Sequence, residues 1–569
     1  MSASEPKHGV PPVAATPLDE VDAQVERLYE NRDRWVAVDI PTRVAILRQC
    51  ADHLAEVAEE WAKATSRNRG LDPNTHEGGE AWLTELAPTM RSIRLLRLAL
   101  EAGGQPKIPR VRTRPDGQKV ATVFPTDTFD KIFFSGMRTD VWLQPGKDAS
   151  QGALYRDKRA GKIKEGAVAL VLGAGNVGSI CPTDVLYKLF CDDEVVIIKT
   201  NPVNAFLGPF WEHMLKPLVA QGFAAVVYGA AEVGIHLCNH PRVSSIHITG
   251  SDKTYDAIVW GGDPAEQARR KASGERQNTR PVSAELGCVT PVFIVPGQWS
   301  RKDMEYQATN IVSMMTNNAS FNCVAAKVLV TATGWAQRDA FLEIFKRRLA
   351  AAAPRKAYYP GAEQRYAAFI ENYPAAEVLG AAGDGVVPWT FVPQIPAKVG
   401  EYALSNEAFC GVIGQVDLDA DTASDFLRAA ASFGNEAVWG TLSCTFIVDP
   451  KTAKREAAAL DRAVAELNYG AISVNLWSGV IFGHGSPPWG AAPGHPPEDI
   501  QSGVDHVHNT YLLDYPEKTV FWAPFRVRPS PAWFDGARNA QTVGRRFFKN
   551  ERKPSFLAVP GIISAALRG

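Results

Sequence analysis

Four short apolar segments between residues 166 and 251 restrict the fold more than any other feature of this sequence. They read AVALVLGAG, EVVIIKT, AAVVYG and VSSIHITGS, and stretches with the apolar spacing of helices separate them. Strands buried in a parallel sheet are nearly continuous apolar runs, and helices form the crossover connections between them. This part of the chain is therefore predicted to fold as a doubly wound, parallel α/β sheet.

The first turn of this unit has two open interpretations. Residues 173–178 read GAGNVG, which fits the GxGxxG pattern of a dinucleotide-binding turn between a strand and a helix. That pattern expects an acidic residue at the end of the next strand to hold ribose hydroxyls, but Lys199 stands there. The alternative is that the small residues only allow the strand and the helix to pack closely.

Length and composition exclude several classes of protein. A chain of 569 residues is expected to form two or three domains. Its net charge of −1 does not indicate binding to nucleic acid or to an anionic membrane. The eight cysteines form no CxxC pair, and no apolar run approaches the ~20 residues that span a bilayer. The first 20 residues lack a signal-peptide pattern, so we expect a cytoplasmic protein. The histidine pairs 236/240 and 506/508 lack further ligands nearby, so no metal site is predicted.

The segments on either side of the α/β unit have different patterns. Residues 18–100 have the periodicity of amphipathic helices, whereas pieces such as FDKIFFSG and TDVWLQPG within 103–165 are interpreted as short strands or a long hairpin. Residues 261–281 are polar and charged and are interpreted as a linker, and residues 517–528 as a strand added at an edge. The apolar end of the chain, 556–567, is interpreted as a packing or subunit-contact segment.

Cys323 is a candidate nucleophile. It lies between an apolar, helical run and the strand-like residues 328–330, close to several small amide and hydroxyl side chains. A thiolate attacks carbonyl carbon readily, and nearby N–H groups can hold the oxyanion that forms. The alternative is simple packing, because free cysteines are among the most buried residue types.

Three motifs, GAGNVG, AELG and NASFNCVAA, occur in this order along the chain and carry a family resemblance. Cys323 resembles the nucleophile in the Asn-x-Gly-Gln-x-Cys segment of the aldehyde dehydrogenase superfamily, and Glu285 resembles the general base of its Glu-Leu-Gly-Gly segment. Asn176 stands where the Pro-Trp-Asn-Phe-Pro segment of the family has the asparagine that serves the oxyanion hole. The resemblance favours this interpretation of residues 173–178 over the GxGxxG one.

Three further motifs resemble the cofactor-binding segments of the same family. Lys199 in VVIIKTNP is similar to the lysine that reaches the adenosine ribose, and ITGS at 248–251 to the turn beside the pyrophosphate. NEAFCG resembles the Glu-x-Phe-Gly-Pro segment that holds the nicotinamide ribose and ring. The resemblance thus implies NAD or NADP as cofactor. The residues assigned to it are Lys199, Thr249, Gly250, Ser251, Glu407 and Phe409.

The sequence also departs from the family pattern. The family's Gly and Gln before the cysteine are Ser320 and Phe321 here, and its second Gly after Glu-Leu-Gly is Cys288. The glutamate that follows the ribose lysine in the family is Pro202, so the choice between NAD and NADP stays open. The chain is therefore interpreted as a divergent member whose aldehyde is not inherited from a known relative.

The resemblance implies two doubly wound α/β domains and a small β element that bridges subunits. Strand exchange through that element predicts a homodimer or homotetramer, and no nucleic-acid or membrane partner is expected. The predicted boundaries are an arm at 1–17, a cofactor domain at 18–130 and 159–284, a catalytic domain at 285–490, bridging strands at 131–158 and 505–528, and a tail at 529–569.

The implied reaction is the oxidation of an aldehyde to a carboxylic acid through a thiohemiacetal and a thioester on Cys323. Asn176 would hold the oxyanion, and Glu285 would activate the water that hydrolyses the thioester. Two alternatives stay open: acyl transfer to coenzyme A on the same fold, and a non-catalytic protein on a decayed scaffold.

Overall fold

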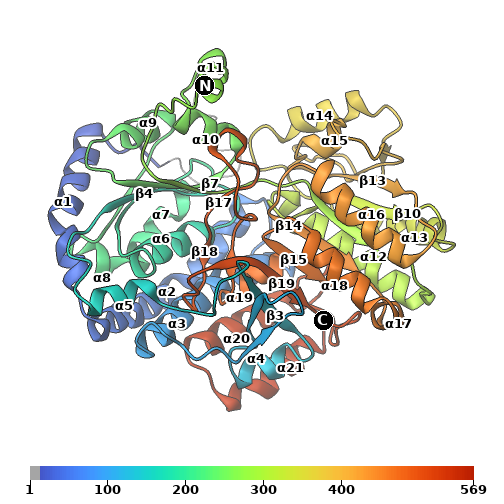
Figure 1. Cartoon of the computed structure of the whole chain (residues 1–569), viewed down its shortest axis with the longest axis horizontal. Coiled ribbons are helices and arrows are strands. Elements are labelled where there is room, and N and C mark those ends of the chain that lie inside the picture. The colour runs from blue at the N-terminus through green and yellow to red at the C-terminus, as the bar shows by residue number, and fades with distance from the viewer. Residues whose placement is uncertain (1–12) are drawn as a thin grey trace.

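The computed structural model describes residues 13–569 and contains two large sheets that lie side by side (Figure 1). A segment from the C-terminal part of the chain, carrying β17 (Gly503–Val504) and β18 (Val507–His508), runs between them (Figure 1). Of the predicted arm, residues 1–12 lie outside the described part of the chain. The predicted α/β fold with two doubly wound sheets is confirmed.

The smaller sheet has six strands. Five of them are parallel, and β17 is added antiparallel at one edge, against β8. The strands in spatial order are β17, β8 (Val282–Leu286), β7 (Ser245–Gly250), β4 (Val168–Leu172), β5 (Val195–Lys199) and β6 (Ala224–Val227). They are the apolar segments predicted from the sequence, and nearly all their side chains are buried.

The larger sheet has eleven strands and combines a parallel centre with antiparallel ends. Its strands in spatial order are β1 (Arg110–Thr113), β2 (Lys119–Phe124), β3 (Arg138–Leu143), β19 (Pro516–Trp522), β15 (Ala471–Val474), β14 (Ser443–Ile447), β9 (Thr290–Ile294), β10 (Ala326–Ala332), β13 (Val412–Leu418), β12 (Thr390–Val392) and β11 (Glu377–Val378).

The strand β19 joins the bridging segment to the rest of the large sheet. It pairs antiparallel with β3 and parallel with β15, so the predicted pairing of the two bridging segments is present. The predicted position at a sheet edge is wrong, because β19 is an inner strand and β1 is the outer one.

Helices cover both sheets. They are α1 (Leu18–Ala37), α2 (Ile40–Asn68), α3 (Ala87–Glu101), α4 (Thr128–Phe133), α5 (Ala153–Arg159), α6 (Ile180–Phe190), α7 (Gly208–Met214), α8 (Lys216–Val219), α9 (Ala231–Asn239), α10 (Asp252–Val259), α11 (Pro264–Ser273), α12 (Arg301–Thr316), α13 (Arg338–Ala351), α14 (Ala362–Asn372), α15 (Tyr402–Ser405), α16 (Ala423–Glu436), α17 (Pro450–Arg455), α18 (Ala457–Glu466), α19 (Gly479–His484), α20 (Ala540–Arg552) and α21 (Val559–Ala566). The described residues contain no helix with the length and apolar character of a membrane span.

Two segments differ from the sequence-based expectation because capping residues start helices in them. FDKIFF was expected to be a strand, but the Asp127 side chain accepts a hydrogen bond from the Asp130 N–H and caps α4. The expected linker 261–281 contains α11, which Asp263 caps at its start and Gly274, with a φ of 72°, ends. In both cases the local cap overrides the composition of the segment.

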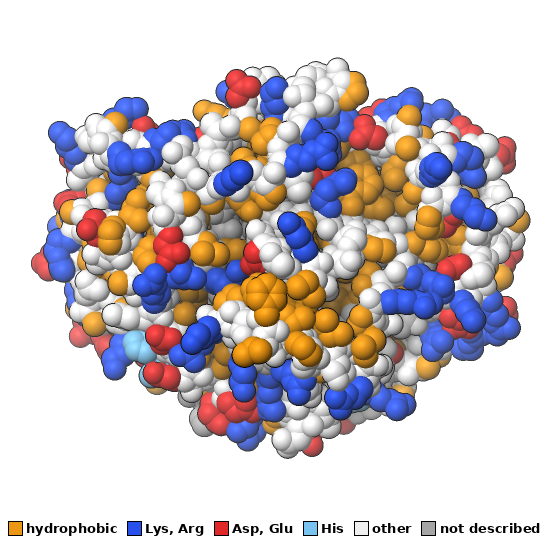
Figure 2. Space-filling model, turned by 90° about the horizontal axis from the view of Figure 1, so that it is seen from below, with side chains coloured by type: hydrophobic (Ala, Val, Ile, Leu, Met, Phe, Trp, Pro, Cys, Tyr) orange, Lys and Arg blue, Asp and Glu red, His pale blue; other side chains and the backbone are white. Residues whose placement is uncertain are grey.

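The C-terminal tail packs against the N-terminal helices. Helix α20 lies on α3, and its Glu551 forms ion pairs with Arg91 and Arg94. The face over α4, α20 and α21 carries hydrophobic side chains among many basic ones (Figure 2). Phe556 and Leu557, in the 3-10 helix η6 (Phe556–Ala558) directly before α21, are 64% and 94% exposed. This end of the chain is thus partly a packing segment and partly a free apolar surface.

Candidate active site

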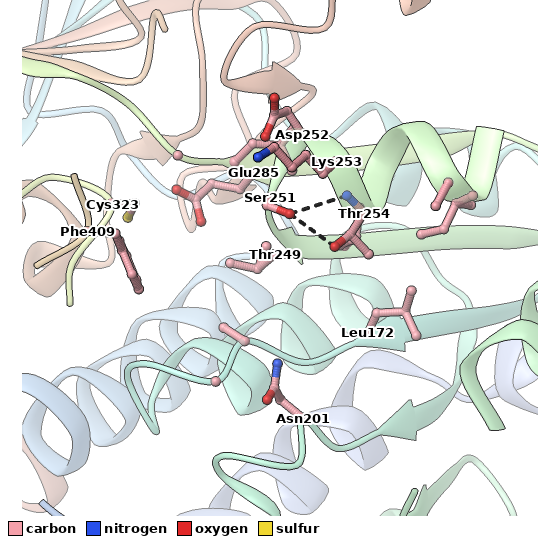
Figure 3. A pocket seen from close by; sticks show the side chains of 18 of the residues that line it. Leu172, Asn201, Thr249, Ser251, Asp252, Lys253, Thr254, Glu285, Cys323 and Phe409 are labelled. Atoms are coloured by element: carbon pink, nitrogen blue, oxygen red, sulfur yellow. Dashed lines mark hydrogen bonds between the residues drawn. The ribbon is translucent and has the colours of Figure 1, made fainter. Parts of the chain in front are cut away.

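A cavity of about 810 Å³ lies between the two sheets, and all nine predicted site residues line it. The small sheet supplies one wall and the large sheet the other, and we call these the small-sheet wall and the large-sheet wall. Figure 3 shows Glu285 and Thr249 on the first and Cys323 and Phe409 on the second. The structure therefore brings together the residues Asn176, Lys199, Thr249, Gly250, Ser251, Glu285, Cys323, Glu407 and Phe409.

The small-sheet wall is built from the carboxyl ends of parallel strands. Lys199 ends β5, Thr249 and Gly250 end β7, and Glu285 is the next-to-last residue of β8. Ser251 then caps α10, where its hydroxyl accepts a hydrogen bond from the Thr254 N–H (Figure 3). Ligands bind doubly wound sheets at this end of the strands.

Lys199 is buried, with 9% of its surface exposed. Burial lowers the pKa of its ammonium group to about 8. A lysine in such a position is stabilised when a polar ligand takes the place of the lost water.

The turn at 173–178 favours the packing interpretation for its first and last glycines. A Cβ on Gly173 would come within 2.9 Å of the Cys181 sulfur, so this glycine permits close contact between strand and helix. The Gly178 N–H donates to the Glu85 carboxylate at 3.1 Å. A carboxylate thus occupies one of the backbone donors that a pyrophosphate would need in the GxGxxG interpretation.

The large-sheet wall contains the loop that carries Cys323. Helix α12 is followed by the 3-10 helix η4 (Asn317–Ser320), and Cys323 lies in a turn before β10. Asn318, Ala319 and Ser320 have φ values of 52°, 53° and 69°, a left-handed conformation that non-glycine residues rarely adopt.

Side chains from distant parts of the sequence hold this loop. Glu80 accepts the Asn318 N–H at 3.1 Å, and the Tyr358 hydroxyl donates to the Asn318 Oδ1 at 2.9 Å. The Lys327 ammonium donates to the backbone carbonyl of Ser320 at 3.0 Å. Sequence reasoning missed Glu80, Tyr358 and Lys327, since none of them stands in a recognisable motif.

Cys323 and Glu285 face each other across the cavity. Burial raises the pKa of Glu285 to about 8, while its contact with the Cys323 thiol acts in the opposite direction. Burial also raises the pKa of the Cys323 thiol, and the neighbouring carboxyl groups of Glu285 and Glu407 raise it further. A buried carboxyl group with a pKa close to 8 is poised for proton transfer near neutral pH.

Asn176 lies beside the same loop. Its side-chain amide donates to the Phe321 backbone carbonyl at 3.0 Å. Its backbone carbonyl accepts from the Asn318 side-chain amide and from the Tyr358 hydroxyl. An amide has two N–H donors, so the Asn176 side chain has one more N–H than the hydrogen bond to Phe321 uses.

Glu407 and Phe409 complete the large-sheet wall. Burial raises the pKa of Glu407, and the positive charges of Lys327 and Arg365 counteract this effect. A Cβ on Gly287 would come within 2.0 Å of a Glu407 carboxyl oxygen, so only glycine fits there. The Phe409 ring packs against Phe321, with 5.7 Å between ring centres.

The histidine pair 236/240 belongs to the end of α9 and lies against α1. Both imidazoles lie near the Asp22 carboxylate, which belongs to α1. Among residues 13–569, no group of three His, Cys, Asp or Glu side chains is arranged to hold a metal ion.

Comparison with known proteins gives matches to one family. Residues 195–363 match the family model described as aldehyde dehydrogenase family. The 4-trimethylaminobutyraldehyde dehydrogenase of Oryzias latipes is 27% identical over 301 residues, which are 48% of this chain and 54% of the relative. The match thus spans only about half the length of that curated relative.

Solved structures share the fold over nearly the whole chain. An aldehyde dehydrogenase of Pseudomonas aeruginosa has a TM-score of 0.61 at 16% identity and covers 90% of each chain. An aldehyde dehydrogenase of Mycobacterium tuberculosis in complex with NAD+ has a TM-score of 0.60 at 15% identity, over 89% of this chain and 91% of that chain. The NADP-dependent glyceraldehyde-3-phosphate dehydrogenase of Bacillus halodurans, in complex with NADP, has a TM-score of 0.59 at 15% identity, over 90% and 92%.

Proposed function

Because the chain belongs to the aldehyde dehydrogenase superfamily, we propose that it oxidises an aldehyde to a carboxylic acid with NAD or NADP. The observation that carries this proposal is that Cys323, Glu285, Asn176 and Lys199 line one cavity, where Glu285 contacts the Cys323 thiol and the Asn176 amide bonds to Phe321 in the same loop. A nucleophile, a base and an oxyanion donor at one place are the groups that an acyl intermediate on sulfur needs.

The cavity residues fit a nicotinamide dinucleotide. The buried Lys199 at the end of β5 would contact the hydroxyls of one ribose, and Glu407 those of the other. The Glu407 Oε1 has no hydrogen-bond partner among the described residues, although it is buried, so it is suited to accept from a ligand. Between α9 and α10, the side chains of Ala231, Ile235 and Ile258 line a largely apolar part of the cavity that would take the flat base. When bound, the nicotinamide ring supplies the oxidant by accepting a hydride.

Cys323 performs the covalent step. Its sulfur attacks the aldehyde carbon and forms a thiohemiacetal, and Glu285 is the base in contact with the thiol that takes up its proton. The free N–H of Asn176 and the backbone N–H of Cys323 stabilise the oxyanion. One such donor contributes roughly 10²–10³ in rate.

Glu285 then serves hydrolysis. After oxidation the acyl group is held on sulfur as a thioester, and the Glu285 carboxylate takes a proton from the attacking water. Its position beside Cys323 supports hydrolysis over acyl transfer to coenzyme A, because acyl transfer to a thiol needs no base for water.

We also propose that the protein assembles as a homodimer or a dimer of dimers. Two surfaces support this proposal: the open edge of β1, and the exposed side chains of Phe556, Leu557 and Leu567 at the C-terminal end. Light scattering at micromolar concentration tests it, and a sharp monomer mass would contradict it.

The reaction is tested with a panel of aliphatic and aromatic aldehydes, each with NAD and with NADP and without coenzyme A. We expect reduced cofactor and carboxylic acid in equal amounts for at least one aldehyde. Cys323→Ala should abolish turnover and keep cofactor binding, whereas the control Cys191→Ala removes another half-buried thiol outside the cavity and should keep activity. Full activity of Cys323→Ala would show that the nucleophile is another residue.

A further inference from the structure

A buried polar cluster lies behind Glu285, between helix α6 and the small sheet. It consists of Asp184 on α6, His247 and Thr249 on β7, and Ser283 on β8. Asp184 and His247 are only 1% and 2% exposed, and neither lines the cavity. A carboxyl group and an imidazole in the apolar layer between a helix and a sheet are costly unless they are paired.

The cluster forms a continuous series of contacts. The Thr249 hydroxyl donates to the Asp184 Oδ2 at 2.9 Å, and the same oxygen lies 3.4 Å from the Nε2 of His247. The other ring nitrogen of His247, Nδ1, lies 2.9 Å from the Ser283 hydroxyl. Ser283 is half-buried, so the series leads from the interior toward solvent.

Strand register places Glu285 at the inner end of this series. In the parallel pair of β7 and β8, Thr249 is the neighbour of Glu285 and His247 is the neighbour of Ser283. Residues two apart on a strand share a face, so these four side chains lie on one face of the sheet. Asp184 reaches that face from α6, close enough for its charge to act on Glu285.

Two carboxyl oxygens, one in the cluster and one on Glu285 beside it, have free hydrogen-bonding capacity. The Asp184 Oδ1 and the Glu285 Oε1 are buried and have no partner among residues 13–569. Buried polar atoms are almost always satisfied by the protein or by ordered water. Two such atoms on neighbouring carboxyl groups are therefore positions where a water molecule or an exchanging proton would bind.

The proposed reaction releases two protons in each cycle, one from the Cys323 thiol when its sulfur attacks the aldehyde and one when the thioester is hydrolysed. Hydrolysis of the thioester breaks the carbon–sulfur bond, forms a carbon–oxygen bond with water and yields a carboxylate, a thiol and one proton. Glu285 takes up both protons in turn, so it must release the thiol proton before hydrolysis and the hydrolysis proton before the next cycle. Cys323 cannot keep the hydrolysis proton as an excess proton, because the returning thiol already takes one of the two protons of water.

We propose that Asp184 and His247 are positioning residues that carry the proton from Glu285 toward Ser283. The proposal rests on the proposed function of Glu285 as the base. The proton moves from the Glu285 carboxyl group to Asp184, with the Thr249 hydroxyl or a water at the free oxygens as the bridge. It then passes through the imidazole of His247, which takes it on Nε2 and releases a proton from Nδ1 to Ser283.

The other groups that face Asp184 do not neutralise it. His508 approaches from β18, but burial lowers the pKa of its imidazole to about 4, so it is uncharged near neutral pH. The Cys181 thiol on α6 is also uncharged, because burial raises its pKa. Glu285 from β8 and His247 from β7 are thus the groups with which Asp184 exchanges a proton.

The experiment uses 4-nitrophenyl acetate as the probe, since it acylates a cysteine without any cofactor. A burst of 4-nitrophenolate reports acylation of Cys323, and the slower steady phase reports hydrolysis of the acetyl thioester. His247→Gln keeps donors and an acceptor toward Asp184 and Ser283 but cannot relay a proton. Ser245→Ala is the matched control, because Ser245 lies on the same face of β7 one step farther from the site and contacts Glu194.

We expect His247→Gln to keep the full burst and to lower the steady rate about tenfold, less than the roughly 10²–10⁴ of direct acid–base catalysis because Glu285 itself is retained. Asp184→Asn should lower the steady rate as well. It should also move the acid limb of the pH–rate profile down by about one unit, because a negative charge beside Glu285 is lost. Ser245→Ala should match the wild type in both phases.

Two results would overturn the relay while leaving the proposed function intact. One is a burst in the wild type together with an unchanged steady rate in His247→Gln, and the other is an unchanged acid limb in Asp184→Asn. A wild-type protein without any burst would instead refute the nucleophile assignment, and the relay with it.

Discussion

On the small-sheet wall of the cavity, Lys199, Thr249 and Glu285 stand at the ends of regular parallel strands, whereas Cys323 on the large-sheet wall follows an irregular loop. The first group is placed by backbone hydrogen bonds of the sheet, which hardly depend on any one side chain. The loop has three successive left-handed residues, and Glu80, Tyr358 and Lys327 hold it. The proposed nucleophile, Cys323, is therefore the part of the site whose position depends on distant side chains.

The largest expected effect is the loss of turnover when Glu285, on the small-sheet wall, is replaced. Glu285→Gln should lower steady turnover by about 10²–10⁴, because an amide cannot take a proton from water. The first turnover should still release about one equivalent of reduced cofactor per active site in a stopped-flow trace. The backbone of β8 should stay in place, so the unfolding midpoint should not fall. Steady turnover at the wild-type rate would return the coenzyme A alternative to consideration.

The next effect concerns the support of the nucleophile loop. Glu80 pairs with Arg69 at 3.1 Å and with Arg355 at 3.2 Å, and it also accepts the Asn318 N–H. Glu80→Ala should lower the free energy of unfolding by about 3 kcal/mol, since it leaves buried charges without their partner. Urea unfolding followed by tryptophan fluorescence measures this loss in the free energy of unfolding.

Glu77 provides the matched control for that variant. It begins the short 3-10 helix η1 (Glu77–Gly79), which Glu80 follows directly, but its side chain is 29% exposed and pairs with the exposed His76 imidazole. Glu77→Ala should change the free energy of unfolding by less than about 0.5 kcal/mol. Equal losses in both variants would mean that the Glu80 network does not stabilise the loop.

A smaller effect is expected in the pH dependence of stability. The folded-state pKa of Glu285 is about 8, above its value of 4.5 in a model compound. Between these two pH values the native state keeps a proton that the unfolded state has lost, so rising pH removes stability. The melting temperature of Glu285→Gln should therefore fall less between pH 6 and pH 9 than that of the wild type, by on the order of 2 °C. Parallel curves would mean that Glu285 titrates near its ordinary value.

The smallest expected effect is a gain in the free energy of unfolding. Ala319→Gly should raise the free energy of unfolding by about 0.5–1 kcal/mol, since glycine adopts the φ of 53° without strain. Ala325→Gly is the control, because Ala325 lies in the turn after Cys323 and is buried but has no positive φ. That variant should lose stability. A loss in both would show that the loop is not strained at residue 319.

The same contrast explains what could be predicted from the sequence. Lys199, Thr249 and Glu285 are found by following apolar strands to their carboxyl ends, and the family resemblance adds Cys323, Asn176, Glu407 and Phe409. Glu80 was not predictable, because it contacts Asn318 across 238 residues of sequence and no pattern links the two.

Two of the parts of the fold that were missed illustrate different reasons. Helix α4 carries a local signal, the cap Asp127, that its phenylalanines concealed. The inner position of β19 depends on tertiary pairing with β3 and β15, which local patterns do not contain. Local sequence patterns therefore predict most helices and strands and the residues of the small-sheet wall. The strand order of the large sheet and the contacts that hold the Cys323 loop depend on residues far apart in the sequence.

The inner position of β19 also determines how late in synthesis β3 can find its partner strand. The strand β3 ends at Leu143 and β19 begins at Pro516, so the ribosome must add more than 370 residues before the two can pair. At about 5–20 residues per second, this takes roughly 20–75 s, during which the β3 edge of the antiparallel β2–β3 pair has no partner strand. During this interval the nascent chain exposes a strand edge that favours association with other chains. Successful production of the protein thus depends on what shields residues 138–143 until the last tenth of the chain has emerged.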